Sequence, residues 1–447
     1  MKILIVGGGG REHALAWKLA QSPKAEKIYC APGNAGIAET AECVPIKAED
    51  IEGLCRFAEE NRIDLTVVGP EVPLALGLVD ALAEKGLKAF GPNKKCAQLE
   101  SSKSFTKAFL SRHGIPTAGY REFTDIDEIK RSVGIFGYPM VIKADGLAAG
   151  KGVVIAKDEA AALKAIDEIM GEKIFGSAGD KVVVEEFLTG IEASVLCFVD
   201  GKTIVPMESA QDYKRVFDGD EGPNTGGMGA YSPSLVFNEE VDAKIREQIL
   251  EPTIRGFQED GLDFKGVLFI GLMITEEGPK VIEFNIRFGD PETQAVLPRM
   301  KTDLLDIMLA VAEERLAEQP IEWSDKKAVC VGMVSGGYPG SYEKGKRISG
   351  LEKVDDDVIV FHAGTKRAPH ECPSTINDMT AGGTPESMIV TDGGRVLGVT
   401  ALGDTHEEAR EKAYRNVTRI SFEGAHYRKD IGLLNRKWTP PNGNNRK

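Results

Sequence analysis

Several features that would place this chain in other classes of protein are absent from its sequence. The longest apolar stretch, residues 267–274, is far shorter than the roughly 20 residues that a membrane-spanning helix needs. The apolar run over residues 1–6 is too short for the core of a secretory signal peptide. The seven cysteines are scattered and never spaced as CxxC, which argues against a zinc ribbon or a disulfide framework. We therefore expect a cytoplasmic protein with reduced thiols that binds no membrane.

Basic residues are also fewer than acidic ones. The chain has 55 lysines and arginines against 69 aspartates and glutamates, a formal net charge of −14. This balance disfavours nucleic acid as a partner, but it leaves room for a basic pocket that takes a small phosphorylated ligand. At about 150 residues per domain, the 447 residues predict roughly three folded units.

The first hundred residues alternate between strand and helix patterns. Buried strand-like runs at residues 2–6, 27–31 and 65–68 are separated by helical patterns, and a further helix is predicted over 73–85. Such βαβ units predict a parallel sheet that binds ligands at the carboxyl ends of its strands. From about residue 102, strand pairs followed by helices predict an antiparallel α+β unit instead.

A polar, glycine-rich segment over residues 212–229 shows little regular pattern, and loops of that length are usually functional or disordered. Beyond Pro320, further strand patterns and a helix over 407–420 predict another small unit. We therefore predict a multidomain α/β and α+β protein. Its expected units are residues 1–101, residues 102–322 with a lid subdomain at about 120–190, residues 323–426, and a tail over 427–447.

Four glycines, residues 7–10, lie between the first strand and the first helix. In this geometry, backbone amides and the helix amino end can receive a phosphate. The dinucleotide fingerprint GxGxxG is broken, because Glu12 takes its sixth position. The second strand also ends in Ala31-Pro32, where a nicotinamide enzyme would place an acid. The sequence thus favours a phosphate contact at this turn over a nicotinamide cofactor.

A second glycine-rich loop covers residues 146–152. It is one residue too short for a Walker A loop, Gly152 replaces the hydroxyl residue, and a strand follows instead of a helix. We interpret it as a flexible hairpin that carries Lys151 over a polyphosphate. Taken alone, the loop fits a surface hairpin with an incidental lysine equally well.

The segment over residues 281–287 is the most informative about function, because it combines several side chains that can bind a metal or a substrate. On a strand, Glu283, Asn285 and Arg287 share one face. The other face is expected to hold Ile282, Phe284 and Ile286. A carboxylate and an amide oxygen suit Mg²⁺, and the arginine can hold a substrate carboxylate. Residues 288–293, rich in ligand-type side chains, favour this interpretation over an ordinary half-exposed strand.

Together these features resemble the ATP-grasp enzymes, and more narrowly the phosphoribosylamine–glycine ligase family (glycinamide ribonucleotide synthetases). The matching motifs run along nearly the whole chain: GGGREHAL at 8–15, APGNAG at 31–36, VGPE at 68–71, IKADGLAAGKGV at 142–153, GPNTGGMG at 222–229, RFGDPET at 287–293, FHAGT at 361–365 and RKDIG at 428–432. So long and ordered a set is highly specific.

The resemblance implies a ligase that joins glycine to 5-phosphoribosylamine in the second step of de novo purine synthesis. ATP would form glycyl phosphate, and the products would be glycinamide ribonucleotide, ADP and phosphate. The implied fold is an N-terminal parallel α/β sheet domain, a central ATP-grasp fold with a flexible lid, and a small C-terminal α+β domain. The implied cofactor is Mg²⁺ or Mn²⁺, and we expect a monomer.

The resemblance also implies a role for individual residues. ATP would be bound by Lys103, Lys143, Gly150, Lys151, Glu185, Glu186, Phe187, Leu188 and Glu192. The catalytic residues would be Arg287, Asp212 and Lys214, which line the glycine and acyl phosphate site, and Asp290, which lies close to the ribosylamine. The ribosylamine, with its phosphate near Gly9 and Gly10, would be bound by Gly9, Gly10, Glu71, Asn224 and Gly289. The metal ligands would be Glu283 and Asn285.

Two departures from the family leave questions open. Residues 267–274 contain no acid, so the number of metal ions is undetermined, and residues 366–386 are longer than expected and are interpreted as a surface insertion. Three alternatives are another ATP-grasp ligase, a nicotinamide oxidoreductase and an inactive nucleotide-binding regulator. The regulator is disfavoured because five residues that the chemistry needs are intact: Lys143, Lys151, Glu283, Asn285 and Arg287.

Overall fold

The computed structural model describes residues 1–148, 152–368 and 388–433. Gly150, Lys151 and most of the expected insertion at 366–386 lie outside these residues. Within the described residues, no helix is long and apolar enough to span a membrane.

The N-terminal part is a parallel sheet, as the sequence predicts, and it has five strands in the order β3-β2-β1-β4-β5. Its strands are β1 (Lys2–Gly7), β2 (Lys27–Pro32), β3 (Glu42–Cys43), β4 (Leu65–Val68) and β5 (Ala89–Phe90). Its helices are α1 (Gly10–Leu19), α2 (Ile51–Glu60), α3 (Glu71–Leu76), α4 (Leu78–Glu84) and α5 (Lys94–Ser101). The helix predicted over 73–85 is in fact two helices, because Gly77 adopts a left-handed conformation with φ of 94° and ends α3.

The central part contains two antiparallel sheets of four strands each. The first, which we call the lid sheet, has the order β6-β9-β7-β8 and comprises β6 (Tyr120–Phe123), β9 (Val182–Glu186), β7 (Met140–Ala144) and β8 (Val153–Ala156). The second, the floor sheet, has the order β11-β10-β16-β17 and comprises β11 (Ile204–Pro206), β10 (Ile191–Asp200), β16 (Lys265–Thr275) and β17 (Gly278–Asn285).

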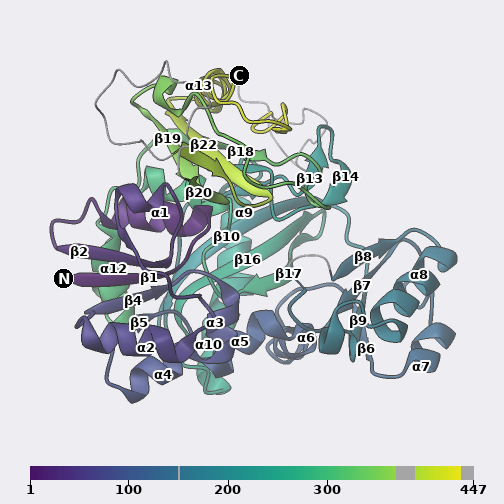
Figure 1. Cartoon of the computed structure of the whole chain (residues 1–447). Coiled ribbons are helices and arrows are strands. Elements are labelled where there is room, and N and C mark those ends of the chain that lie inside the picture. The colour runs from purple at the N-terminus through teal and green to yellow at the C-terminus, as the bar shows by residue number, and fades with distance from the viewer. Residues whose placement is uncertain (149–151, 369–387, 434–447) are drawn as a thin grey trace, which may run out of the picture.

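Helices cover both central sheets. Those of the lid are α7 (Ile126–Arg131) and α8 (Glu159–Ile166), and the lid stands to one side of the molecule, beyond α6 (Figure 1). The others in this part are α6 (Lys103–Arg112), α9 (Glu239–Ile245), α10 (Glu251–Glu259), α11 (Glu292–Val296) and α12 (Leu304–Ala312). This arrangement places the floor sheet between the lid and the N-terminal sheet.

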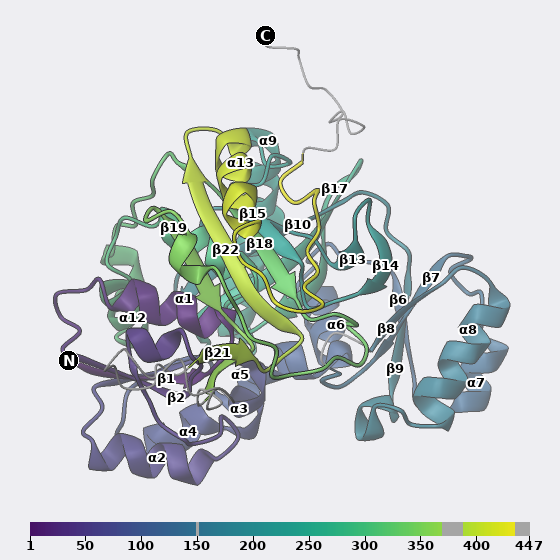
Figure 2. The same ribbon diagram turned by 45° about the horizontal axis from the view of Figure 1, so that its top comes forward.

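A third antiparallel sheet has the order β12-β15-β18-β22-β19 and is covered by α13 (His406–Val417), which lies along β18 and β22 (Figure 2). Its strands are β12 (Gln211–Asp212), β15 (Gly229–Ser232), β18 (Lys327–Val334), β22 (Arg395–Gly403) and β19 (Val358–His362). Two small hairpins are built from β13 (Arg215–Phe217) with β14 (Glu221–Asn224), and from β20 (Thr365–Ala368) with β21 (Met388–Thr391).

The expectation of little regular structure over residues 212–229 is therefore wrong. The segment contains the β13–β14 hairpin, and β12 and β15 at its two ends join the C-terminal sheet. These strands have two to four residues, too few to show an alternating pattern.

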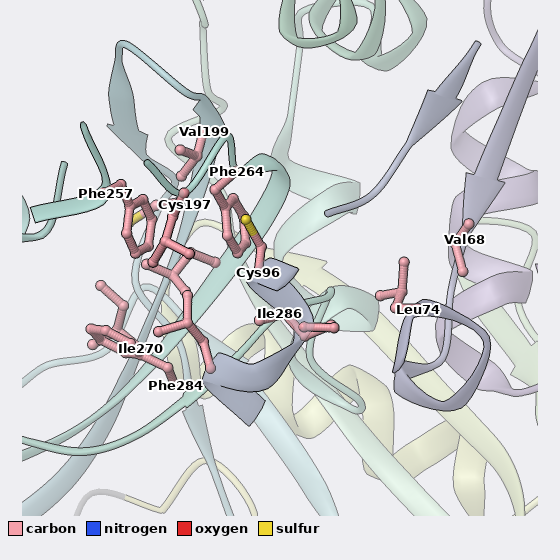
Figure 3. Close-up of a cluster of buried hydrophobic side chains, with 14 of the residues drawn as sticks. Val68, Leu74, Cys96, Cys197, Val199, Phe257, Phe264, Ile270, Phe284 and Ile286 are labelled. Carbon is pink, nitrogen blue, oxygen red and sulfur yellow. The ribbon is translucent and has the colours of Figure 1, made fainter. Parts of the chain in front are cut away.

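A single apolar cluster supports the face of the floor sheet opposite the site. Phe257 and Phe264 stack with ring centroids 5.3 Å apart, and Phe284 of β17 packs in the same cluster. Figure 3 shows this cluster reaching to Val68 and Leu74 of the N-terminal part. Burying each such phenylalanine contributes about 1.5–3 kcal/mol, so strand β17 is fixed in place from behind.

Candidate active site

A cavity of about 1200 Å³ lies between the lid sheet, strand β17 and residues 211–226. Most of the site residues expected from the sequence line it: Lys143, Glu185, Glu186, Phe187, Leu188, Glu192, Asp212, Lys214, Asn224, Glu283, Asn285, Arg287 and Asp290. Five other expected residues are not on its wall: Lys103, Glu71, Gly9, Gly10 and Gly289.

The side chains of strand β17 alternate largely as expected. Glu283 and Asn285 face the cavity, and Phe284 lies in the core on the opposite side. Ile282 departs from the prediction because it lines the cavity instead of packing in the core. The cause is a β-bulge, since Glu283 pairs with Gly271 while Val281 pairs with the next residue, Leu272, leaving Ile282 unpaired.

Glu283 sits among three lysines. Burial opposes its ionisation, but the charges of Lys214, Lys103 and Lys143 outweigh burial and lower the pKa of Glu283 to about 2. Lys103 thus acts on the site without lining the cavity, and its ammonium donates to the carbonyl of Glu100 at 3.1 Å. At neutral pH the site holds an ionised carboxylate surrounded by positive charge.

The donor set on β17 fits Mg²⁺. Asn285 Nδ2 donates to Glu283 Oε1 at 3.3 Å, so the two side chains lie next to each other on the cavity wall. On the neighbouring strand β16, Phe269 and Gly271 lie opposite these two residues and add no carboxylate. In the part of the chain that the structure describes, no group of three metal-binding His, Cys, Asp or Glu occurs. Mg²⁺ commonly takes one or two protein ligands and leaves its other positions to phosphates and water.

At the lid end of the cavity, Lys143 and Glu185 form a buried ion pair. Lys143 Nζ lies 2.8 Å from Glu185 Oε1 and donates to the carbonyl of Ile282 at 3.2 Å, which links the lid sheet to β17. Glu185 Oε2 lies 3.0 Å from Nζ of Lys107, a residue that the sequence did not single out. The carboxylate expected near adenine is therefore held by two lysines.

Beside residues 211–226, a second charged group faces the cavity. Lys214 Nζ lies 2.9 Å from Glu192 Oε2. Burial opposes the charge of Lys214, but Glu192 and Asp212 outweigh it and raise the pKa of the lysine. Glu292, which the sequence suggested only as part of a motif, also lines this region. Burial and then the charge of Asp212 raise the pKa of Glu292 well above its usual range.

Arg287 is held by two carboxylates from the N-terminal part. Its Nη2 donates to Glu100 Oε1 at 2.9 Å, and its Nε lies 3.4 Å from Glu71 Oε2 without forming a hydrogen bond. Glu71 is thus in contact with the site although it does not line the cavity. Glu100 was missed because it ends a helix that the sequence did not suggest, and it also accepts from the amide of Ile286 at 2.8 Å.

Asp290 lies where the three parts of the chain meet. Arg395 of β22 binds it at 3.1 Å, and Gln294 donates to it at 2.7 Å. Burial opposes its ionisation, but Arg395 and Arg11 lower the pKa of Asp290 below its ordinary value.

The glycine turn of α1 borders the same corner. A Cβ on Gly9 would lie 3.6 Å from Asp290 Oδ2. The Gly9 amide already donates to Glu12 Oε2 at 2.6 Å. This amide, which the sequence suggested as a phosphate donor, is therefore satisfied within the turn.

Gly10 and Gly289 are packed closely on either side of this corner. A Cβ on Gly10 would lie 2.6 Å from Gln294 Nε2, and one on Gly289 would lie 2.5 Å from Glu292 Oε2. A larger residue at either position would therefore push the Gln294 or Glu292 side chain out of its present place.

Two antiparallel four-stranded sheets that enclose paired lysines and a carboxylate–amide pair define an ATP-grasp fold. The solved biotin carboxylase domain of Hydrogenobacter thermophilus 2-oxoglutarate carboxylase shares this fold, with a TM-score of 0.70 at 15% identity over 95% of this chain and 91% of that one. Models of the three phosphoribosylglycinamide synthetase domains match in order: the N domain over residues 1–100, the ATP-grasp (A) domain over 101–293 and the C domain over 328–434.

Whole-chain relatives agree with these models. The phosphoribosylamine–glycine ligase of Caldanaerobacter subterraneus subsp. tengcongensis is 51% identical over 431 residues, which cover 96% of this chain and 99% of that protein. The crystal structure of phosphoribosylamine–glycine ligase from Thermotoga maritima matches with a TM-score of 0.80 and 32% identity, covering 96% of this chain and 100% of that one. The chain belongs to the phosphoribosylglycinamide synthetase family.

Proposed function

We propose that this protein joins glycine to 5-phosphoribosylamine at the expense of ATP, giving glycinamide ribonucleotide, ADP and phosphate. One observation carries the proposal beyond family membership. A single cavity runs from Lys143 of the lid, past Glu283 and Arg287, to Asp290 beside the N-terminal glycine turn. One cavity can thus take ATP, a small carboxylate and an amine in sequence.

In the first step, a glycine carboxylate oxygen attacks the γ-phosphorus of ATP, and ADP leaves. In the second, the amine of 5-phosphoribosylamine attacks the carbonyl carbon of glycyl phosphate, phosphate leaves, and the amine loses a proton. Both steps depend on positioning and charge neutralisation, so no nucleophilic side chain is required.

The contacts support distinct roles for the residues. Lys143 and Lys103 are proposed to face the ATP phosphates. The residues proposed to contact the nucleoside are Glu185, Glu186, Phe187, Leu188 and Glu192. Arg287 is proposed to bind the glycine carboxylate, because its buried Nε lacks a hydrogen-bond acceptor. Asp212 and Lys214 lie beside it on the cavity wall. The residues proposed at the ribosylamine end are Gly9, Gly10, Glu71, Asn224, Gly289 and Asp290.

Glu283 and Asn285 would hold the Mg²⁺ or Mn²⁺. The ion would neutralise phosphate charge during transfer. Lys103, Lys143 and Lys214 keep Glu283 ionised for this role.

An ADP-release assay in which each component is omitted in turn tests the function. We expect ADP only when ATP, Mg²⁺, glycine and 5-phosphoribosylamine are all present. Equal release with alanine or serine in place of glycine, or with ammonia in place of ribosylamine, would instead indicate another ATP-grasp ligase. We also propose that the enzyme acts in the cytoplasm and is a monomer. Light scattering coupled to gel filtration can check that it is monomeric.

A further inference from the structure

Lys107 is a buried lysine on α6 that takes no part in the mechanism above. Its side chain is 3% exposed, and it does not line the cavity. Its ammonium contacts Glu185 Oε2 at 3.0 Å, donates to Thr117 Oγ1 at 2.8 Å, and lies 5.7 Å from the ring centre of Tyr120. Burying an ammonium this deeply is unfavourable unless it is paired, so the site around it must compensate.

The compensating carboxylate is shared with a lysine of the cavity. Glu185 lies between Lys107 and Lys143, one at each oxygen, and none of the three side chains is more than 5% exposed. With both lysines charged, the triad carries a net charge of +1. Without Lys107, Glu185 and Lys143 would form a neutral pair in the same place.

Lys107 also joins two parts of the molecule. It belongs to α6, where the lid sheet meets the rest of the chain (Figure 1), whereas Glu185 and Lys143 belong to lid strands β9 and β7. Thr117, which accepts from Lys107, donates in turn to the carbonyl of Val281 at 2.7 Å. Lys107 therefore fixes the lid carboxylate relative to β17, close to Glu283.

From this geometry we propose that Lys107 is a positioning residue for ATP. By binding Glu185 from α6, it leaves the charge of Lys143 available to the ATP phosphates and holds that lysine at the edge of the cavity. The proposal rests on the proposed function, in which Lys143 binds ATP.

Binding of ATP with Mg²⁺ to the full chain, measured by titration calorimetry without the other substrates, tests the role. We expect Lys107→Met to raise the Kd for ATP about tenfold, because Glu185 would then be paired with Lys143 alone and would neutralise the charge that Lys143 offers to the phosphates. Lys107→Arg should restore the Kd to within about threefold, since it keeps the charge. Lys107→Gln provides the same test if the Met variant does not fold.

Lys181→Met is the matched control. Lys181 donates to Ser104 Oγ of α6 at 3.0 Å and so also links the lid to α6, but among the described residues its ammonium forms no hydrogen bond or ion pair with a residue of the cavity wall. We expect its Kd for ATP to be unchanged. In turnover assays, Lys107→Met should raise the KM for ATP while the KM for glycine and kcat stay within about threefold.

A double-mutant cycle tests whether Lys107 acts through Glu185. Once Glu185→Gln has removed the shared carboxylate, adding Lys107→Met should change the Kd for ATP by less than about twofold. If the two losses multiply instead, Lys107 does not act through Glu185 and the proposal fails.

The dependence of the Kd for ATP on pH also distinguishes this proposal from a purely structural role of Lys107, which would leave that dependence unchanged. Burial is the main cause that lowers the pKa of Lys107 to about 8. The charge of Glu185 opposes this shift, and the charge of Lys143 adds to it. Glu186 of β9 and the Tyr120 ring of β6 also face Lys107. The Kd for ATP should therefore rise above pH 8 in the wild type and stay flatter in Lys107→Arg.

The outcomes separate the two proposals. If the wild type binds ATP and Lys107→Met binds it equally well, Lys107 only stabilises the fold and the inference is wrong. If the wild type binds ATP but releases ADP without regard to glycine, the proposed ligase reaction is wrong while the role of Lys107 stands.

Discussion

Arg287 illustrates how a residue of the site depends on partners from distant parts of the chain. Its guanidinium is held by Glu100 from α5 and approached by Glu71 from α3. Burial opposes its charge, but these carboxylates outweigh burial and raise the pKa of Arg287. The arginine is therefore a fixed, permanently charged group, suited to binding a carboxylate in one orientation.

At Glu283, the loss of one carboxylate should abolish most of the activity. We expect Glu283→Ala to lower kcat/KM by about two to three orders of magnitude and to weaken the Mg²⁺ dependence, because it removes the only carboxylate of the proposed metal site. ADP release measured over a Mg²⁺ titration checks both effects.

Glu277→Ala is the control for this prediction, since Glu277 precedes β17, is exposed and pairs only with Lys280 among the described residues. Its activity should match that of the wild type. Wild-type turnover in Glu283→Ala would contradict the assignment of Glu283 to the metal.

For single residues, local sequence patterns predicted which face of a strand a side chain lies on, but not which residues it contacts. The two-residue period of a strand placed Glu283, Asn285 and Arg287 on one face, and the structure confirms this because the period is a local property. Local patterns could not predict the β-bulge at Ile282 or the ion pair between Lys107 and Glu185. Both depend on contacts between separate elements.

Among the elements, the β13–β14 hairpin at the mouth of the cavity depends on the segment after α13. Arg428 is fully buried, binds both oxygens of Asp430, and reaches Asp220 and the carbonyl of Arg215 in the hairpin. Its guanidinium also stacks 4.8 Å from the ring centre of Tyr213. One arginine thus anchors an active-site hairpin to the C-terminal part.

Replacing Arg428 by lysine should loosen this hairpin. A lysine keeps the charge but cannot make the forked contacts, so we expect a loss of about 2 kcal/mol of stability and faster hydrogen exchange at residues 213–226. Mass spectrometry of exchanged peptides measures the second effect directly. Arg415→Lys on exposed α13 should leave exchange in this segment unchanged; equal exchange in Arg428→Lys and the wild type would show that Arg428 does not anchor the hairpin.

Long elements were predicted well and short ones were missed. The parallel strands β1, β2 and β4 and the floor strands β16 and β17 were recognised because continuous or alternating apolar patterns extend over several residues. The two-residue strand β3 was not predicted. The short strands β12 to β15 exist because β12 and β15 pair within the C-terminal sheet and β13 pairs with β14. Their polar and glycine-rich sequences alone favour a loop.

For the whole molecule, a histidine pair fastens the N-terminal part to the C-terminal part. The amide of His362 donates to His13 Nδ1 at 2.7 Å, and His362 Nδ1 pairs with Thr365 Oγ1 at 3.1 Å. Burial is the main cause that lowers the pKa of His13 to about 3 and that of His362 to about 4. Both rings are therefore neutral in the folded protein under ordinary conditions.

This pair makes stability depend on mild acid. Unfolded histidines take up protons near pH 6.5, whereas the folded ones remain neutral to about pH 4. The contribution of these two histidines to stability is therefore nearly constant above pH 7 and falls as the pH decreases from 6.5 toward 4, by roughly 2 kcal/mol per histidine between pH 7 and pH 5.

Denaturant titrations of the wild type and His362→Asn at pH 7 and pH 5 check this dependence. Asparagine can place a polar atom near the former Nδ1 but does not titrate, so the variant should lose about 2 kcal/mol less than the wild type between the two pH values. Because the same carboxylates titrate in both proteins, equal losses would show that His362 does not cause the acid sensitivity.

The contacts of Asp290, where the three parts of the chain meet, also determine when the site can be completed while the protein is being translated. The ribosome releases the glycine turn of α1 first, the end of β17 much later, and β22 later still. Arg395 of β22 binds both the Asp290 side chain and the carbonyl of Gly226. A nascent chain that stops before β22 thus has the lysine end of the cavity but lacks the cation that fixes the opposite corner, so the site is completed only after β22 has been synthesised.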